Sequence, residues 1–268
     1  MAEKKERSAV TAISTSDLHS INVRGKELAR DLIGVVSFTD HFWLLVTGEL
    51  PTDDQRFVLD AVLVAISEHG LVTSNQAARM TLAAAPDAFQ GAVAAGILGC
   101  GSVVLGASEA AGRFLTRVAE RCDHGEGELQ AAIRAELSEM RGKRQPVPGY
   151  GHHQHPDGDP RAKRLFELAH ARGVAGRYVA IAEAAEPIAQ EVYGRFLPVN
   201  VSGAIPAVML DAGFPTGAMK GIPILARTAS LIAHLHEEAS KPMGFILSRT
   251  AAEVVEYDGL PLGQSVHS

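Results

Sequence analysis

Apolar side chains recur at helical spacing along most of this chain, whereas the strict alternation that is typical of strands is scarce. In the segment 126–141, for example, Leu129, Ile133 and Leu137 share one face of a helix. The pattern therefore predicts an all-α fold. The predicted helices cover residues 52–70, 126–141, 159–172, 175–193, 201–213 and 218–238.

Local signals mark the ends of the first of these helices. Thr52 and Gln55 have the spacing of a capping box, in which each side chain bonds to the backbone N–H of the other residue. Gly70 is suited to close the helix, because glycine adopts the left-handed conformation that commonly follows a last helical turn.

A chain of 268 residues can bury a sizeable core, either in one large domain or in a large and a small one. We predict a large helical domain formed by residues 1–107 and 191–268, and a smaller helical lobe formed by residues 108–190. No internal repeat or low-complexity linker separates the two parts.

Composition excludes several classes of protein. The net charge of −6, the pI near 6.0 and the absence of a basic stripe argue against a nucleic-acid partner. Cys100 and Cys122 are the two cysteines, too few for a disulfide framework. The charged segment 1–7 leads into no apolar stretch, so we expect no signal peptide and a soluble, cytoplasmic protein.

The segment 91–107 carries no charge and is at the short end of what could span a membrane. Its four internal glycines, with Glu109 directly after it, favour a different interpretation. We predict a break near Gly99–Gly101, between two buried helices that pack through small residues, and no membrane association.

A stiff loop rich in glycine and proline carries the strongest chemical signal. His152 lies in this loop, nine residues before Arg161. Asp159 and Pro160 suit the N-cap and the first position of a helix, so Arg161 belongs to its first turn. An anion there would meet both a guanidinium group and the positive end of the helix dipole. The pattern predicts a site for a small carboxylate substrate.

This loop gives the chain a resemblance to the citrate synthase family. The resemblance rests first on two segments, Pro148-Gly149-Tyr150-Gly151-His152 and Asp159-Pro160-Arg161-Ala162, and it extends over almost the whole chain. The short length, with Lys241-Pro242-Met243-Gly244 and Tyr257-Asp258-Gly259 near the end, looks most like the compact citryl-CoA lyase-like branch. The other matching segments are Arg24-Gly25, Ser37-Phe38, Thr47-Gly48-Glu49-Leu50-Pro51, Pro198-Val199-Asn200-Val201-Ser202-Gly203, Ala226-Arg227-Thr228-Ala229 and Ile232-Ala233-His234.

The resemblance implies a homodimer with a citrate-synthase-like helical fold. It implies an enzyme that acts on a CoA thioester of a hydroxy-carboxylic acid, cleaving or forming a C–C bond, with citryl-CoA lyase as the nearest activity. No metal and no permanently bound cofactor are implied. His152 would donate to the substrate carbonyl or hydroxyl, Arg161 would clamp a carboxylate, and His69 would hold the oxaloacetate end.

Three positions depart from the family pattern. Val104 stands where the family has a histidine that helps to form the enol, and Ser202 stands at the catalytic aspartate. A serine hydroxyl cannot act as a base near neutral pH without a partner that activates it. Lys241 replaces an arginine, so it offers a point charge in place of a fork. We therefore expect a substrate with fewer carboxylates or altered chemistry, with Ser202 and Lys241 kept as candidate site residues.

In this family, basic residues grip the phosphates of CoA. The cations that flank the loop here and could bind a phosphate are Lys143, Arg144, Lys163 and Arg164.

Other interpretations stay open at this point. His152, His153, His155, Asp157 and Asp159 could form a metal-binding loop, although no HExxH or paired-cysteine pattern accompanies them. A serine hydrolase centred on Ser202 would lack the GxSxG elbow, but hydrolysis of a CoA thioester or a β-diketone remains open on this scaffold. A third alternative is a catalytically inactive dimer that binds acyl-CoA.

Overall fold

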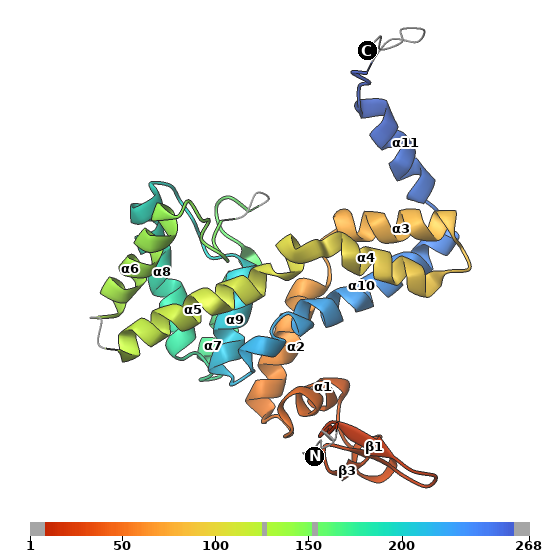
Figure 1. Cartoon of the computed structure of the whole chain (residues 1–268), viewed down its shortest axis with the longest axis horizontal. Coiled ribbons are helices and arrows are strands. Elements are labelled where there is room, and N and C mark those ends of the chain that lie inside the picture. Colours follow the sequence, from red (N-terminus) through yellow and green to blue (C-terminus); the bar gives the residue numbers. More distant parts are fainter. Residues whose placement is uncertain (1–8, 125–127, 152–154, 260–268) are drawn as a thin grey trace, which may run out of the picture. The chain divides into compact units, whose positions relative to one another are not determined.

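The structure is a computed structural model that describes residues 9–124, 128–151 and 155–259 (Figure 1). Helices dominate these residues, which confirms the predicted all-α class. All six predicted helices are present, with ends shifted by three residues or fewer. The α-helices are α1 (Phe38–Thr47), α2 (Asp53–Ser67), α3 (Thr73–Ala84), α4 (Phe89–Leu105), α5 (Ala107–Asp123), α6 (Leu129–Gly142), α7 (Pro160–Ala171), α8 (Arg177–Tyr193), α9 (Val201–Asp211), α10 (Gly221–Ser240) and α11 (Gly244–Val254).

A small antiparallel sheet near the N-terminus was not predicted. Its strands are β1 (Ser14–Ser16), β2 (Ile21–Val23) and β3 (Lys26–Glu27), in the order β1-β2-β3. Strands of two or three residues are too short to show an alternating pattern in a sequence. A single π-helical turn, η1 (Leu28–Leu32), follows the sheet, and a 3-10 turn, η2 (Thr216–Ala218), precedes α10.

The chain divides into two compact units. The first unit comprises Met1–Ile66 with Leu105–Ile222, and the second comprises Ser67–Val104 with Pro223–Ser268. This division differs from the predicted one, which separates 108–190 from the rest. The reason is that α9 packs against α5, α7 and α8 and so belongs with the helices before it. The predicted domain boundaries stay a prediction.

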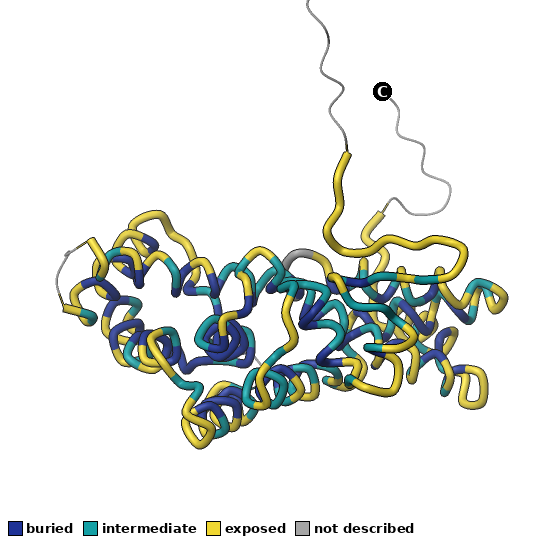
Figure 2. Tube along the Cα trace, turned by 90° about the horizontal axis from the view of Figure 1, so that it is seen from below, coloured by how far each residue is buried: buried dark blue, intermediate teal, exposed yellow. Residues whose placement is uncertain are grey.

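Helix α9 is the central element of the first unit. It is buried along most of its length and carries no charged residue before Asp211. Figure 2 shows the buried residues of the chain in dark blue. A helix that is apolar on all sides is stable only when other helices surround it. Asp211, at its end, accepts from the backbone N–H groups of Gly176, Tyr178 and Val179 at 2.8–2.9 Å and so caps the start of α8.

Small residues allow close packing in the second unit, where α3, α4 and α10 share a core of alanine and leucine side chains. A Cβ at Gly96 would lie 2.6 Å from a methyl carbon of Leu231, so a larger residue there would require that buried side chain to shift. Gly101 has a non-helical backbone (φ 56°, ψ −171°) inside α4, which confirms the predicted break. Among the described residues, none of the helices combines the length and the apolar character needed to cross a membrane.

Candidate active site

A short pairing of two segments fixes the backbone directly before His152. The N–H of Gly151 donates to the carbonyl of Pro198 at 2.7 Å, and the N–H of Asn200 donates to the carbonyl of Gly149 at 2.9 Å. The Asn200 side chain also donates to the carbonyl of Gly151 at 2.6 Å. His152 itself lies outside the described residues, but the residues before it are anchored to the start of α9.

Tyr150 anchors the same segment from its side chain. Its ring packs edge-on against Phe114 at 6.1 Å, and its hydroxyl donates to the carbonyl of Ala182 at 2.9 Å. Burial, reinforced by the charge of Glu186, raises the pKa of Tyr150 well above its ordinary value. The phenol therefore stays neutral and serves as a fixed hydrogen-bond donor.

Two glycines from different segments touch at this pairing. A Cβ at Gly149 would lie 2.6 Å from the Cα of Gly203, and a Cβ at Gly203 would lie 2.5 Å from the carbonyl oxygen of Gly149. No side chain fits at either position without a backbone shift. Both glycines lie in the segments that carry the family resemblance, but the sequence did not reveal their contact.

The carboxylate of Asp159 joins two helices. It accepts from the backbone N–H of Arg161 at 3.0 Å, which confirms the predicted N-cap of α7. It also accepts from the N–H of Val201, the first residue of α9, at 2.9 Å. Both helix N-termini, with their partial positive charges, therefore point at one buried carboxylate.

The guanidinium group of Arg161 forms a two-pronged ion pair with the same carboxylate. Its Nε and Nη2 lie 2.9 Å and 2.8 Å from the oxygens of Asp159. Two of the five guanidinium N–H donors thus face Asp159, and a substrate carboxylate would have to use the other edge of the group. The predicted role of Arg161 as a clamp stays a prediction.

Ser202 lies at the second position of α9, half-buried. Its backbone N–H donates to the side-chain oxygen of Asn200 at 2.9 Å, which caps the helix. Ser202 is therefore placed at a helix N-terminus, two residues after the segment that pairs with Gly149–Gly151. Its match to the family's aspartate stays a prediction.

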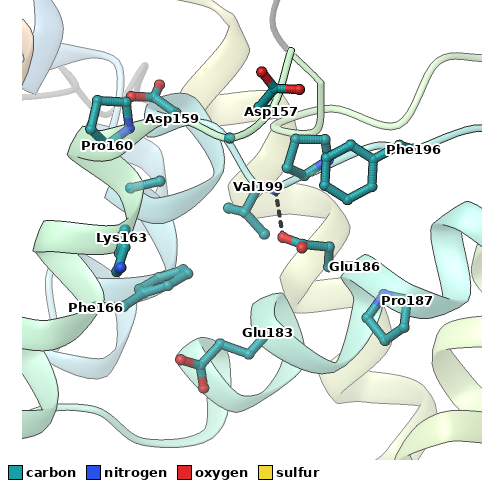
Figure 3. Close-up of a pocket in the computed structure, with 13 residues that line it drawn as sticks. Asp157, Asp159, Pro160, Lys163, Phe166, Glu183, Glu186, Pro187, Phe196 and Val199 are labelled. Carbon is teal, nitrogen blue, oxygen red and sulfur yellow. Dashed lines mark hydrogen bonds between the residues drawn. The ribbon is translucent and has the colours of Figure 1, made fainter. Parts of the chain in front are cut away.

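A cavity of about 590 Å³ opens beside this loop in the first unit (Figure 3). Phenyl rings form part of its wall, and the carboxylate of Glu186 accepts from the N–H of Val199 at 2.9 Å, the bond that Figure 3 marks. Its carboxylates outnumber its single ammonium group, which makes it a poor place for a phosphate. The polar and aromatic residues of the wall include Asp157, Asp159, Lys163, Phe166, Glu183, Glu186 and Phe196.

The four cations predicted to bind phosphates are spread over different places. Lys163 lines the cavity beside the loop, whereas Arg164 lines a second cavity of about 510 Å³ between α2 and α7. Lys143 and Arg144 follow the end of α6, a helix that packs on α5 and α8. Lys143 pairs with Glu139 at 2.7 Å. Their joint action on a phosphate stays a prediction.

In the second unit, His69 lies in the turn that follows α2, half-buried. Lys241 follows α10 and is 74 % exposed, with its ammonium nitrogen 3.5 Å from Glu237. Arg79 lies in the core of this unit and is only 1 % exposed. Sequence reasoning did not predict this buried charge. Arg79 shares the buried face of α3 with Ala78 and Leu82, and the structure, not the sequence pattern, identifies that face.

Comparison with known proteins identifies the family to which this architecture belongs. Residues 55–249 match the family described as "Citrate synthase, C-terminal domain". The chain belongs to the citrate synthase family. It is 27 % identical over 206 residues to "Citrate synthase 2" of Bacillus subtilis (strain 168), covering 74 % of this chain and 51 % of that protein. The chain thus spans about half the length of the curated relatives that it matches.

Solved structures extend the match to the compact branch of the family. The citryl-CoA lyase from Hydrogenobacter thermophilus superposes with a TM-score of 0.84 at 32 % identity, over 97 % of this chain and 98 % of that one. Methanosaeta concilii ATP citrate lyase in complex with (3S)-citryl-CoA gives a TM-score of 0.77 at 22 % identity, over 97 % of this chain and 43 % of that one. The second likeness concerns the fold alone. The predicted membership in a citryl-CoA lyase-like branch is confirmed.

A metal site finds no support in the described part of the chain, where no group of three or more His, Cys, Asp and Glu side chains could hold an ion. Of the loop residues considered as ligands, His152 and His153 lie outside the described residues. Asp159 is committed to Arg161 and to two helix N-termini.

The pairing of Asp159 makes stability depend on pH. Burial raises the pKa of Asp159, but the bonds from Arg161 and Val201 outweigh burial and hold its pKa below the ordinary value of 3.8. As the pH falls, the unfolded chain therefore takes up this proton before the folded protein does. The contribution of Asp159 to the free energy of unfolding is complete above the ordinary carboxyl pKa of 3.8 and is lost as the pH falls below that value.

We expect the free energy of unfolding to drop more between pH 7 and pH 3 in the wild type than in Asp159→Asn, which has no proton to gain there. Urea denaturation at the two pH values measures this difference. Asp157→Asn, an exposed change in the same loop, is the control and should keep the wild-type dependence. An identical pH dependence in wild type and Asp159→Asn would contradict the assignment.

Proposed function

We propose that this protein cleaves citryl-CoA, or a closely related CoA thioester of a hydroxy-carboxylic acid, at a C–C bond. The observation that carries the proposal is the match to a citryl-CoA lyase over nearly the full length of both chains. Formation of the same bond, as in a citrate synthase, is the reverse of this reaction and uses the same site. The CoA thioester is then a substrate and no cofactor is held permanently.

The cleavage is a retro-aldol step. A base takes the proton of the substrate hydroxyl, the C–C bond breaks as the hydroxyl carbon becomes a carbonyl, and the leaving thioester enolate takes up a proton. Imidazole titrates near working pH, so His152 is our candidate for the proton transfer at the hydroxyl. Backbone N–H groups near the break at Gly101 are our candidates for stabilising the enolate oxygen.

We assign the carboxylates of the substrate to His69, Arg161 and Lys241. Lys241 offers a point charge, whereas an arginine would offer two parallel donors. This favours a substrate that needs fewer two-pronged contacts than a tricarboxylate bound by arginines alone. Ser202 is retained as a candidate catalytic residue because of its place at the family's aspartate position and at the start of α9.

The uncharged part of CoA is assigned to the cavity of about 590 Å³, because its walls combine rings with carboxylates that repel phosphate. The phosphates require cations, and one of the candidates, Lys163, lies in the wall of this cavity. The candidates remain Lys143, Arg144, Lys163 and Arg164.

We also propose a homodimer that works in the cytoplasm, in keeping with the family resemblance. Light scattering coupled to size-exclusion chromatography gives the mass directly. A mass of one chain at all concentrations would refute the dimer.

Mass spectrometry of the products tests the proposed reaction. The protein is incubated with citryl-CoA and, separately, with acetyl-CoA plus oxaloacetate, with His152→Ala as the matched variant. We expect acetyl-CoA and oxaloacetate from citryl-CoA with the wild type, and a rate lower by about 10²–10⁴ in the variant. Hydrolysis of the thioester alone would favour the hydrolase, and binding without turnover would favour an inactive acyl-CoA-binding dimer.

A further inference from the structure

The turn that carries His69 is fastened to helix α10 through one carboxylate. Glu68 accepts from the backbone N–H groups of His69 and Gly70 at 2.8 Å and 2.6 Å. It also accepts a hydrogen bond from the hydroxyl of Ser230, which belongs to α10. A carboxylate oxygen of Glu68 lies 3.0 Å from Nε2 of His234, on the same helix. The side-chain amide of Asn75 also donates to Glu68, at 3.4 Å, so groups from the turn, α3 and α10 converge on one side chain.

The far side of the same turn is held as well. Asn75, from α3, donates through its side-chain amide to the carbonyl of Gly70 at 2.6 Å. Gly70 has a φ of +72°, so the chain reverses sharply at this point. The N–H groups of His69 and Gly70 are therefore held by Glu68, and the carbonyl of Gly70 is held by Asn75 from α3.

The imidazole of His234 links this turn to the buried arginine. Its Nδ1 lies 3.1 Å from Nε and 2.8 Å from Nη2 of Arg79. A guanidinium group can only donate, so Nδ1 is the acceptor toward Arg79. Nε2 lies between Glu68, at 3.0 Å, and the side-chain amide nitrogen of Asn75, at 2.8 Å. Arg79 is held in turn by Glu237 at 2.5 Å and Glu238 at 2.9 Å.

Glu68 is placed for positioning more than for core stability. Its side chain is 48 % exposed, whereas the core of this unit is formed by Ala78, Leu82, Leu231 and their neighbours. Burial raises the pKa of Glu68, but hydrogen bonds from Ser230 and from the turn outweigh burial and bring that pKa below its ordinary value of 4.5. At neutral pH the group is an anion that only accepts hydrogen bonds, which suits the donors around it.

We propose that Glu68 and His234 are positioning residues for His69, fixing the turn so that the His69 imidazole meets the substrate in one orientation. The inference rests on the proposed role of His69 in binding the substrate. A small misplacement of a binding group is enough to lower the rate or the affinity on the order of a hundredfold.

Steady-state kinetics with citryl-CoA separate positioning from general damage. In Glu68→Gln we expect KM to rise about tenfold or more while kcat changes by less than about threefold, because the loss concerns substrate binding. His234→Gln, which keeps a donor and an acceptor, should retain more activity than His234→Leu. The control is Glu191→Gln, the loss of an exposed ion pair with Arg134, which should leave both constants unchanged.

A double-mutant cycle is the decisive comparison. If Glu68 acts through His69, the double variant Glu68→Gln/His69→Ala should be no worse than His69→Ala alone. Independent, multiplying losses in the double variant would overturn the proposal.

An exchange measurement keeps the inference testable if citryl-CoA is not the substrate. We expect amide hydrogen exchange at His69 and Gly70 to speed up at least tenfold in Glu68→Gln, while amides of α6 keep their rates. Unchanged exchange at the turn would refute the fastening by Glu68. No turnover in the wild type, with faster exchange in the variant, would refute the proposed function and leave the fastening standing.

Discussion

Arg79→Met is expected to lower the free energy of unfolding by about 3–5 kcal/mol, as measured by urea denaturation. Arg79 and Glu238 are 1 % and 3 % exposed, so removal of the guanidinium leaves a carboxylate buried without its counter-charge. Glu238 also accepts from the N–H groups of Met243 and Gly244, which hold it in place. His234 would lose its donor at Nδ1 at the same time.

Two comparisons test this explanation. Arg113→Met removes an exposed pair with Glu109 and should cost less than about 1 kcal/mol. Arg79→Met/Glu238→Gln should be more stable than Arg79→Met alone, because the second change removes the uncompensated charge. A loss below about 1 kcal/mol in Arg79→Met would contradict the assigned role of the buried pair.

The parts of the fold that sequence reasoning predicted are those set by neighbouring residues. Thr52 and Gln55 form the reciprocal capping box, with bonds of 2.9 Å and 3.2 Å between each backbone N–H and the other side chain. Asp159 caps α7 ahead of Pro160, as its type and position predicted. Such signals act within one helical turn, so a linear pattern contains them.

The contacts that organise the candidate site are of another kind. His234 meets Glu68 across 166 positions and Arg79 across 155. No spacing rule reports a contact between residues so far apart, because the fold alone brings them together. The resemblance supplied His69 as a site residue, but only the structure shows the groups that hold its backbone.

The family resemblance implies a framework kept while two of its acid–base positions changed. The pairing of Gly149–Gly151 with the start of α9 and the Asp159–Arg161 pair hold the backbone in place. By the same resemblance, Ser202 and Val104 match positions where the family has groups that move protons. Since the framework and the proton-transfer groups depend on different residues, one can change while the other stays. Substitutions in the framework should therefore lower both stability and activity, whereas substitutions of the proton-transfer groups should lower activity alone.

Gly203→Ala is the strongest test of that framework. The new Cβ would lie 2.5 Å from the carbonyl oxygen of Gly149 and 3.1 Å from Val199, so the backbone on one side must move. We expect a loss of about 1–3 kcal/mol in the free energy of unfolding. Activity should fall on the order of a hundredfold, because a shift of Gly149 displaces the segment that leads into His152.

A matched glycine shows whether the contact is the cause. Gly142 lies at the end of α6 with nothing within 4 Å of an added Cβ, so Gly142→Ala should change neither stability nor activity appreciably. Gly149→Ala should reproduce the effect of Gly203→Ala, since its Cβ would lie 2.6 Å from the Cα of Gly203. Because both changes break the same contact, their double variant should lose less than the sum of the two. Full activity in Gly203→Ala would show that the loop finds its place without this contact, and Tyr150, Asp159 and Asn200 would then be its remaining anchors.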